Sequence, residues 1–412
     1  MFLKNFVYQI KRPYHFFKTG LLEALPAQIK YRFPGRKLKI IAISGTDGKT
    51  TSCSLLYHLL KQAGKKVALV STVAAYINDQ EIDTGFHVTS PAPADLYRFM
   101  RQAVDQGVEY FIVEYTSQGA YQFRLFGLKP QIAGITNINR DHFDYHLNYD
   151  NYLLAKARIL QKSEVVVLNE DDQSFYRLRK LLPSTQHLVL TYNDQEKLSP
   201  VIKQAIKQRF PEAFNQMNAR LVEKIASYLK IEPQLIAQSI SSFPGVRGRM
   251  QFLDLKQLTG KQYPFQVVVD FAHTPQGLTE ALTALRQTMK QKHLTGRLIV
   301  IHGAAGLRDK AKRPLMGQIS SELADLVVLT AEDPRTENVW SIIRQMKEDL
   351  NNNHRKVLSI ANRQQAINFT LQKLAKKGDL VALLGKGPEQ SMAYGHTEHP
   401  WDEVKAVQKA LR

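Results

Sequence analysis

Nine short runs of apolar, largely β-branched residues recur along this chain, and helix-like stretches separate them. This alternation predicts βα units around largely parallel sheets. Nine strands are more than one small sheet usually needs, so we expect two α/β domains. The runs are residues 38–44, 67–70, 110–115, 132–136, 165–168, 266–270, 298–302, 326–330 and 380–384.

The segment SSFPGVRGR at 241–249 is a plausible junction, because its Pro and Gly residues break helix and strand. We therefore expect a short N-terminal segment (1–39), a central domain (40–247) and a C-terminal domain (248–412). The N-terminal segment is basic and aromatic, with nine Lys or Arg and a single acid, Glu23. It could be an interfacial membrane helix or a clamp for a diphosphate. We favour a helix that packs on the central domain with a solvated basic face.

The chain carries 56 Lys and Arg against 37 Asp and Glu, a formal charge of +19. Such a surplus attracts nucleic acid, anionic membrane surfaces or small phosphorylated and carboxylated substrates, and composition does not choose among them. The single cysteine, Cys53, excludes an intramolecular disulfide, and we interpret it as a packing residue. Without a secretion signal or an apolar run of about 18 residues, we expect a cytoplasmic protein.

The sequence IIAISGTDGKTTS places a glycine-rich turn between the first apolar run and an amphipathic helix at 50–63. Glycines let backbone N–H groups approach phosphates, the helix N-terminus adds positive potential, and Lys49 supplies a mobile charge. Thr50 is positioned to ligate Mg²⁺. The spacing is shorter than G-x-x-x-x-G-K-[ST], since Ile43 occupies the place of the first glycine. The predicted phosphate loop comprises Gly45, Thr46, Asp47, Gly48, Lys49, Thr50 and Thr51.

Acids and histidines follow two other runs at their C-terminal ends, where ligands bind in open α/β sheets. Glu114 ends the run at 110–115, where a carboxylate can hold a metal beside the phosphates. A second cluster, Asp141, His142, Asp144 and His146, follows the run at 132–136. Together with the phosphate loop, these groups favour a metal site over a plain solvated loop.

A series of motifs in order resembles the Mur ligases, ATP-dependent amide-forming enzymes of peptidoglycan precursor synthesis, and covers nearly the whole chain from about residue 39. Within that family, the resemblance is greatest to the tripeptide synthetases, which add the third amino acid of the stem peptide. The motifs are GTDGKTT, EYTSQGAYQFR, ITNINRDHFDYHLNYDNYLLAKARIL, FNQMN, GRMQF, VVVDFAHTPQGL, GLRDKAKRPLMG, EDPRTEN and GKGPEQ. The resemblance implies a P-loop central ATPase domain and a Rossmann-like C-terminal domain that binds the amino acid.

The resemblance also implies roles at the ATP site. Lys49 would act on the phosphates, Thr50, Glu114 and His142 would hold Mg²⁺ at two sites, and Lys156 would carry a carbamate formed from CO₂ that helps to hold the second ion. Further residues that match the family's contacts to ATP are Asn218, Arg249, Asp270 and His273.

Other matching positions imply contacts with the muramoyl substrate and the incoming amino acid. The muramoyl contacts would be Thr89, Ser90, Ser117, Gln122 and Arg124, although Gln118 stands where the family has a histidine. The amino-acid contacts would be Arg308, Asp333, Arg335, Gly385 and Glu389, with the arginines bidentate to carboxylates. Asp333 replaces the asparagine associated with meso-diaminopimelate, and Pro388 replaces a histidine. These changes leave meso-diaminopimelate and L-lysine open, and Arg335 favours the former.

The implied reaction is the condensation of a carboxylate with an amine through an acyl phosphate, with catalysis by positioning and charge neutralisation. Typical members carry a further N-terminal domain that holds uridine diphosphate, whereas only 39 residues precede the central domain here. An acceptor other than a UDP-muramoyl dipeptide, such as a folate in the folylpolyglutamate synthases, is the alternative. A nucleic-acid-binding protein is a weaker rival, because no nucleic-acid module is recognisable. We expect a monomer with small-molecule substrates, no nucleic-acid partner, and at most weak membrane contact through 1–39.

Overall fold

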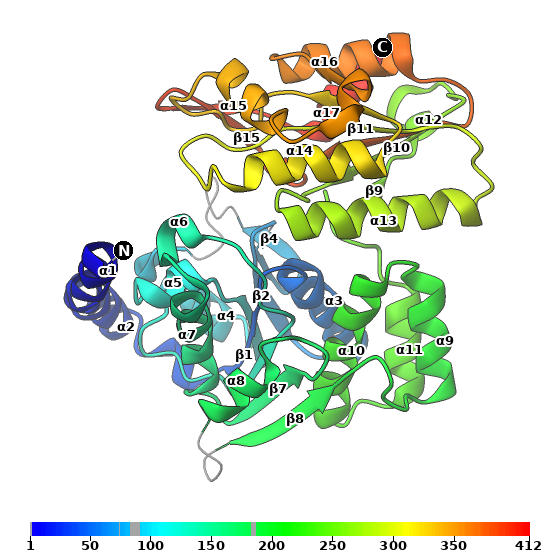
Figure 1. Cartoon of the computed structure of the whole chain (residues 1–412). Coiled ribbons are helices and arrows are strands. Elements are labelled where there is room, and N and C mark those ends of the chain that lie inside the picture. The colour runs from blue at the N-terminus through cyan, green and yellow to red at the C-terminus, as the bar shows by residue number, and fades with distance from the viewer. Residues whose placement is uncertain (1, 74, 83–90, 183–186) are drawn as a thin grey trace. The chain divides into compact units, whose positions relative to one another are not determined.

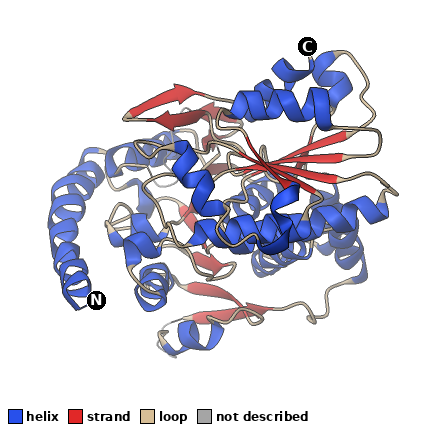
Figure 2. Ribbon diagram, turned by 45° about the horizontal axis from the view of Figure 1, so that its top comes forward, coloured by secondary structure: helices blue, strands red, loops and turns tan. Residues whose placement is uncertain are grey.

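The computed structural model describes residues 2–73, 75–82, 91–182 and 187–412. It divides into two compact units, Met1–Pro244 and Gly245–Arg412, each described by itself. All nine apolar runs form strands, so the α/β fold expected from the sequence is confirmed. Figures 1 and 2 show the elements of both units.

The first unit is built on an eight-stranded sheet, in which β2, β5, β1, β6, β7 and β8 run parallel and β3 and β4 add an antiparallel edge. The central strand, β1, lies between β5 and β6, so the loop that leaves it is flanked by two further strand ends. In spatial order the strands are β4 (Gln80–Ile82), β3 (Ala75–Ile77), β2 (Val67–Val70), β5 (Tyr110–Glu114), β1 (Lys39–Ser44), β6 (Ile132–Ile135), β7 (Val165–Asn169) and β8 (Leu188–Tyr192).

Helices cover both faces of this sheet, because successive side chains of a strand point to opposite faces. On β6, Gly134 lies against Leu221 of α10, whereas Ala133 and Ile135 share a core cluster with Leu153 of α7. The helices are α1 (Phe2–His15), the π-helical η1 (Phe16–Ala24), α2 (Leu25–Lys30), η2 (Pro34–Arg36), α3 (Lys49–Gln62), α4 (Pro93–Asp105), α5 (Ser117–Tyr121), α6 (Phe143–His146), α7 (Tyr149–Leu160), α8 (Phe175–Lys180), α9 (Pro200–Arg209), α10 (Ala213–Tyr228) and α11 (Pro233–Ser241).

The second unit has a six-stranded sheet that is parallel except for β9. Val268 of β10 packs in one core cluster and its neighbours Val267 and Val269 in another, which places a hydrophobic layer on each face. A hairpin of β15 (Ser391–Tyr394) and β16 (Thr397–Pro400) follows. In spatial order the sheet is β13 (Val357–Ser359), β12 (Leu326–Leu329), β11 (Leu298–His302), β14 (Leu380–Leu384), β10 (Gln266–Asp270) and β9 (Gln251–Phe252). The helices are α12 (Leu255–Thr259), α13 (Pro275–Gln291), α14 (Lys312–Leu323), α15 (Val339–Met346), η3 (Asn351–Lys356), α16 (Arg363–Phe369), η4 (Thr370–Leu374) and α17 (Glu403–Leu411).

Candidate active site

The glycine-rich turn joins the C-terminal end of β1 to the first turn of α3. Gly45 and Gly48 have φ angles of +149° and +81°. A Cβ atom at Gly45 would lie 1.8 Å from the Thr136 hydroxyl oxygen, and one at Gly48 would lie 2.1 Å from the Asn218 amide oxygen. Both positions therefore require glycine, for the φ angle and for the close approach of a neighbouring side chain.

Hydrogen bonds from the loop after β6 hold the turn in place. The backbone N–H of Thr46 donates to the Asn137 carbonyl at 2.8 Å, and that of Asp47 donates to the Asn137 side chain at 3.0 Å. The Thr136 hydroxyl donates to the Asp47 carbonyl at 2.6 Å. Lys49 Nζ donates to the Thr46 carbonyl at 2.6 Å, so the lysine charge lies over the turn. Thr51 is half-buried in the first turn of α3.

Glu114, at the end of β5, contacts the phosphate loop directly. One of its carboxylate oxygens accepts hydrogen bonds from the Thr50 hydroxyl at 3.0 Å and from the Thr72 backbone and hydroxyl at 3.0 and 2.9 Å. The side chain is buried, with 1% of the residue exposed. Thr50 and Glu114 thus place hydroxyl and carboxylate oxygens side by side, a donor set that suits Mg²⁺.

The acid and histidine cluster after β6 is arranged differently. His142 has a φ of +54° at the start of α6, with Nε2 3.3 Å from an Asp141 carboxylate oxygen. His146 is fully buried and contacts the Ser117 hydroxyl through Nε2 at 3.0 Å and the Tyr8 hydroxyl through Nδ1 at 2.8 Å. Burial lowers the pKa of His146 to about 3, so the ring stays neutral. Among the described side chains, no three His, Cys, Asp or Glu residues gather closely enough to hold a metal.

Lys156 reaches the phosphate loop from α7, although only 1% of the residue is exposed. Its Nζ donates to the Gly45 carbonyl and lies 4.5 Å from the centre of the Tyr152 ring. Burial, reinforced by the charge of Lys49, holds the pKa of Lys156 well below its usual value. A lowered pKa favours the neutral, nucleophilic form of the amine.

Asn218 and two of the expected muramoyl contacts also lie near this end of the sheet. Asn218 is buried on α10 beside Gly48, and its amide nitrogen donates to Asn215 at 3.2 Å. Arg124 donates to the Gln122 side chain at 2.8 Å, and Gln122 donates in turn to the Tyr145 hydroxyl at 2.9 Å.

The third muramoyl contact, Ser117, meets His146 as described above. The remaining two, Thr89 and Ser90, lie outside the described residues.

In the second unit, Asp270 ends β10 and organises the segment that carries Arg249. Its two carboxylate oxygens accept from the backbone N–H groups of Met250 and Ala272, each at 2.7 Å. Burial raises the pKa of Asp270, and Arg249 opposes that rise. The Arg249 guanidinium lies 4.4 Å from the centre of the Phe271 ring.

His273 follows in the turn before α13. Its Nδ1 lies 2.8 Å from the Phe271 carbonyl oxygen, and its own carbonyl accepts from Lys312 Nζ at 2.8 Å. The second unit thus holds Arg249, Asp270 and His273 in one region around Phe271.

Three of the residues expected at the amino-acid site meet beyond the ends of β12 and β14. Asp333 accepts from Lys386 Nζ at 2.8 Å, and Glu389 lies 2.5 Å from the same Nζ. Arg335 pairs with the backbone of Ala393, and its guanidinium donates to the Gly306 carbonyl at 2.8 Å. Asp333 and Arg335 have φ angles of +44° and +51°.

The other two residues expected at the amino-acid site, Gly385 and Arg308, differ in their exposure to solvent. Gly385 packs against the Glu332 carboxylate, since a Cβ atom there would lie 2.3 Å from Glu332 Oε2. Arg308 is exposed on the loop before α14. Arg308 is therefore the expected contact that the structure leaves most open to solvent.

In two further residues of this region, burial and neighbouring charges shift the pKa in a way that the sequence motifs did not indicate. Lys386 is completely buried between carboxylates, which raise its pKa although burial by itself lowers it. Glu332 is 5% exposed, and its Oε2 has no hydrogen-bond partner among the described residues. Burial raises the pKa of Glu332 to about 7, against the opposing charges of Lys312, Arg363 and Lys386. Both residues lie inside quoted motifs, but their burial and their charged neighbours are visible only in the structure.

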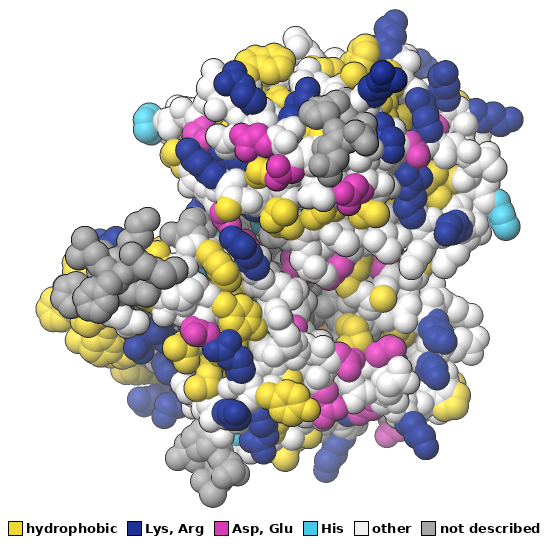
Figure 3. Space-filling model, in the orientation of Figure 1, with side chains coloured by type: hydrophobic (Ala, Val, Ile, Leu, Met, Phe, Trp, Pro, Cys, Tyr) yellow, Lys and Arg dark blue, Asp and Glu magenta, His cyan; other side chains and the backbone are white. Residues whose placement is uncertain are grey.

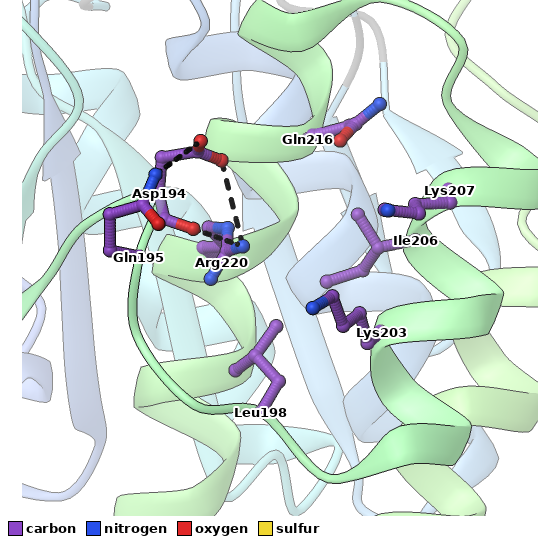
Figure 4. Close-up of a pocket in the computed structure, with 8 residues that line it drawn as sticks. All are labelled: Asp194, Gln195, Leu198, Lys203, Ile206, Lys207, Gln216 and Arg220. Atoms are coloured by element: carbon purple, nitrogen blue, oxygen red, sulfur yellow. Dashed lines mark hydrogen bonds and ion pairs between the residues drawn. The ribbon is translucent and has the colours of Figure 1, made fainter.

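A separate pocket of about 170 Å³ lies between α9, α10 and the loop after β8 (Figure 4). Arg220 of α10 lines it and donates to the Asp194 carbonyl at 2.7 Å, and Lys203 and Lys207 line it from α9. None of the expected site residues lines this pocket. No helix among the described residues is both long and apolar enough to cross a membrane.

Comparison with known proteins gives matches along most of the chain. Residues 43–236 match the Mur ligase middle domain, and residues 248–387 match the Mur ligase glutamate ligase domain. The UDP-N-acetylmuramoyl-L-alanyl-D-glutamate–2,6-diaminopimelate ligase 1 of Clostridium acetobutylicum is 31% identical over 403 residues, covering 93% of this chain and 80% of that protein.

Solved structures agree in fold. A UDP-N-acetylmuramoyl-L-alanyl-D-glutamate–2,6-diaminopimelate ligase superposes with a TM-score of 0.57 at 27% identity, covering 93% of this chain and 81% of that chain. A folylpolyglutamate synthase of Mycobacterium tuberculosis, complexed with ADP, superposes with a TM-score of 0.67 at 16% identity, covering 89% and 92%. The second likeness shows a shared fold only.

Proposed function

Because this chain belongs to the Mur ligase family of ATP-dependent, ADP-forming amide ligases, we propose that it adds 2,6-diaminopimelate to a UDP-N-acetylmuramoyl-L-Ala-D-Glu-type acceptor. The observation that carries the proposal is the meeting of Lys49, Thr50, Glu114 and Lys156 around the phosphate loop. The names of the similar ligases favour 2,6-diaminopimelate over L-lysine. Diaminopimelate carries one carboxylate more than lysine, and an arginine such as Arg335 can bind it bidentately.

The reaction needs the acceptor's carboxylate to be converted into an electrophile. Its oxygen attacks the γ-phosphorus of ATP, which gives ADP and an acyl phosphate; the neutral amine then attacks the carbonyl carbon, and phosphate leaves. Lys49 and the N-terminus of α3 stabilise the charge on the phosphates. Thr50 and Glu114 would hold Mg²⁺, which supplies further charge neutralisation when bound. His142 completes the proposed ligand set.

We assign Lys156 the role of a carbamylated lysine. Only a neutral amine has the lone pair that attacks CO₂, and the buried site of Lys156 favours that state. The product is an anion, with loss of one proton, and its charge suits a position near Lys49 and a metal ion. Carbamylation would therefore turn a buried amine into an anionic ligand for Mg²⁺.

The second unit would bind the incoming amino acid beyond the ends of β12 and β14. Arg335 and the exposed Arg308 would pair with its carboxylates, and Glu389 with an ammonium group. Asp333 is already bound to Lys386, which positions the strained turn that carries Arg335. In this arrangement ATP would be contacted by Arg249, Asp270 and His273.

Phosphate release in the presence of ATP and Mg²⁺ tests the proposal. The purified protein would be offered UDP-N-acetylmuramoyl-L-Ala-D-Glu with a panel of amino acids, and release should depend on both and be fastest with meso-diaminopimelate. Lys49→Ala is the matched inactive control. Release with L-lysine alone would correct the amino acid, and release only with a pteroate and glutamate would replace the proposal by folate glutamylation.

A further inference from the structure

The helical segment that begins the chain exposes large apolar side chains. Ile10, Tyr14, Phe17, Leu22 and Ile29 are 55–60% exposed. Scattered apolar residues on a surface are ordinary, but a contiguous row marks an interaction site. Figure 3 shows hydrophobic side chains gathered on this segment, at the left of the view, with basic side chains beside them.

The spacing of these residues places them on one face. Ile10, Tyr14 and Phe17 are separated by four and three residues, about one α-helical turn each. Phe17 and Leu22 are five residues apart, which is the i to i+5 step of the π-helix η1, where the Leu25 N–H bonds to the Gly20 carbonyl. The π-helical stretch thus keeps the row in line.

The opposite face of the segment packs on the first unit, so the exposed row is not part of a loose helix. Tyr8 stacks on Tyr121 with ring centres 4.4 Å apart. Gln28 donates to the Phe126 carbonyl at 3.1 Å. The buried residues of this face are Tyr8, Thr19, Gly20, Ala24, Ala27 and Gln28.

The charge around the row selects its partner. Among residues 8–37 the only acid is Glu23, whereas the bases are Lys11, Arg12, Lys18, Lys30, Arg32, Arg36 and Lys37. Lys18 lies 5.9 Å from the Tyr14 ring centre, beside the row itself. A second copy of this segment would bring like charges together, whereas an anionic lipid surface complements them.

We propose that the exposed face of residues 8–37 binds peripherally to bilayers containing anionic phospholipids. The apolar row enters the headgroup boundary, Tyr14 lies at the interface, and the lysines contact lipid phosphates. The helix lies along the surface without crossing it.

Co-sedimentation of the full-length protein with vesicles tests the proposal. At low salt, binding to vesicles of phosphatidylcholine with about 30% phosphatidylglycerol should exceed binding to pure phosphatidylcholine by at least tenfold, and high salt should reduce it. Phe17→Ser with Leu22→Ser should weaken the binding tenfold or more. Tyr176→Ser, which removes another exposed ring, is the matched control and should have no effect.

A second pair of variants separates site-specific from general charge effects. Lys18→Glu with Lys30→Glu should abolish most of the binding, whereas Lys203→Glu with Lys207→Glu, on α9, makes the same change in net charge and should leave binding largely intact. Equal losses in the two pairs, no binding to anionic vesicles, or self-association through Phe17 and Leu22 in sedimentation velocity would overturn the proposal.

Discussion

Lys156 in the first unit and Lys386 in the second are both buried, but their surroundings are opposite. Lys156 meets a backbone carbonyl and the face of an aromatic ring, and its pKa is lowered. Lys386 meets two carboxylates, at 2.8 and 2.5 Å, and its pKa is raised. The depth of burial is the same, so the difference comes from the partners.

This contrast shows why burial alone does not tell what a lysine does. A buried amine without a carboxylate in contact has a lowered pKa, which favours the neutral form that can act as a nucleophile. A buried amine between two carboxylates stays charged and holds the turn that they occupy, at a cost if either partner is removed. Four expected outcomes test the comparison, from the largest effect to the smallest.

Lys156→Ala should lower amino-acid-dependent phosphate release by about a thousandfold, the order expected when one preorganised charged group is lost from a phosphoryl-transfer site. A short-chain carboxylic acid added to this variant should restore part of the rate by filling the place of the carbamate. Lys180→Ala, at an exposed position of α8, is the control. Unchanged activity of Lys156→Ala would remove the lysine from the reaction.

Lys386→Met should lower the free energy of unfolding by about 3–5 kcal/mol, because it removes the buried cation that neutralises the carboxylates of Asp333 and Glu389. Lys156→Met should change it by less than about 1 kcal/mol, since no carboxylate is left uncompensated there. Urea denaturation followed by circular dichroism measures both. Trp340 and Trp401, the only tryptophans, report on the second unit by fluorescence. Equal destabilisation by the two variants would break the comparison.

The buried Glu332 shows the effect of burial on the pKa of a carboxyl group. The folded protein keeps its proton up to about pH 7, whereas the unfolded chain releases it near the ordinary value of 4.5. The folded state thus binds more protons between these values, and the free energy of unfolding falls as pH rises through the window. The loss is up to about 3 kcal/mol at 1.36 kcal/mol per pKa unit.

Glu332→Gln should flatten this decline, as measured by tryptophan fluorescence in urea at pH 5 and pH 8. The variant should be less sensitive to the change of pH than the unsubstituted protein. Parallel pH dependence of the two proteins would show that Glu332 ionises normally.

Arg335→Ala should raise the KM for the amino acid by about tenfold to a hundredfold, the value of one or two hydrogen bonds between charged groups. The KM for ATP should stay unchanged, because Arg335 is not among the residues proposed to contact ATP. Arg344→Ala on α15 controls for the loss of a charge. A rise in both constants would remove Arg335 from the amino-acid site.

The interior of each sheet could be predicted from the sequence, but the edges could not. Buried parallel strands such as β1 and β11 consist of continuous β-branched runs, which are distinctive. The apolar runs did not indicate seven strands. In the two large sheets the missed strands lie at or next to an edge. The seven strands are β3, β4, β8, β9, β13 and the hairpin strands β15 and β16. Edge strands are short or half-exposed: β9 has two residues, and Leu188 of β8 is 51% exposed.

The site divides in a similar way. The phosphate loop could be predicted because its glycines and Lys49 follow a strand at fixed spacing. The structure shows why Gly45 and Gly48 must be glycine, since a Cβ atom at either position would clash with a neighbouring side chain. The lowered pKa of Lys156 could not be predicted, because it depends on the burial of this residue on α7 and on the charge of Lys49, which belongs to α3. The pairing of Lys386 with Asp333 joins residues 53 positions apart, a contact that no local pattern contains.

The contact between Tyr8 and His146 has a consequence for energetics. The neutral His146 ring bridges the Tyr8 and Ser117 hydroxyls, with one nitrogen for each. A ligand that engages Ser117 alters the bonding available to the ring and therefore to Tyr8 on the N-terminal helix. If the muramoyl substrate binds at Ser117 as proposed, a partner of the N-terminal helix whose affinity it changes must change the affinity for that substrate by the same factor.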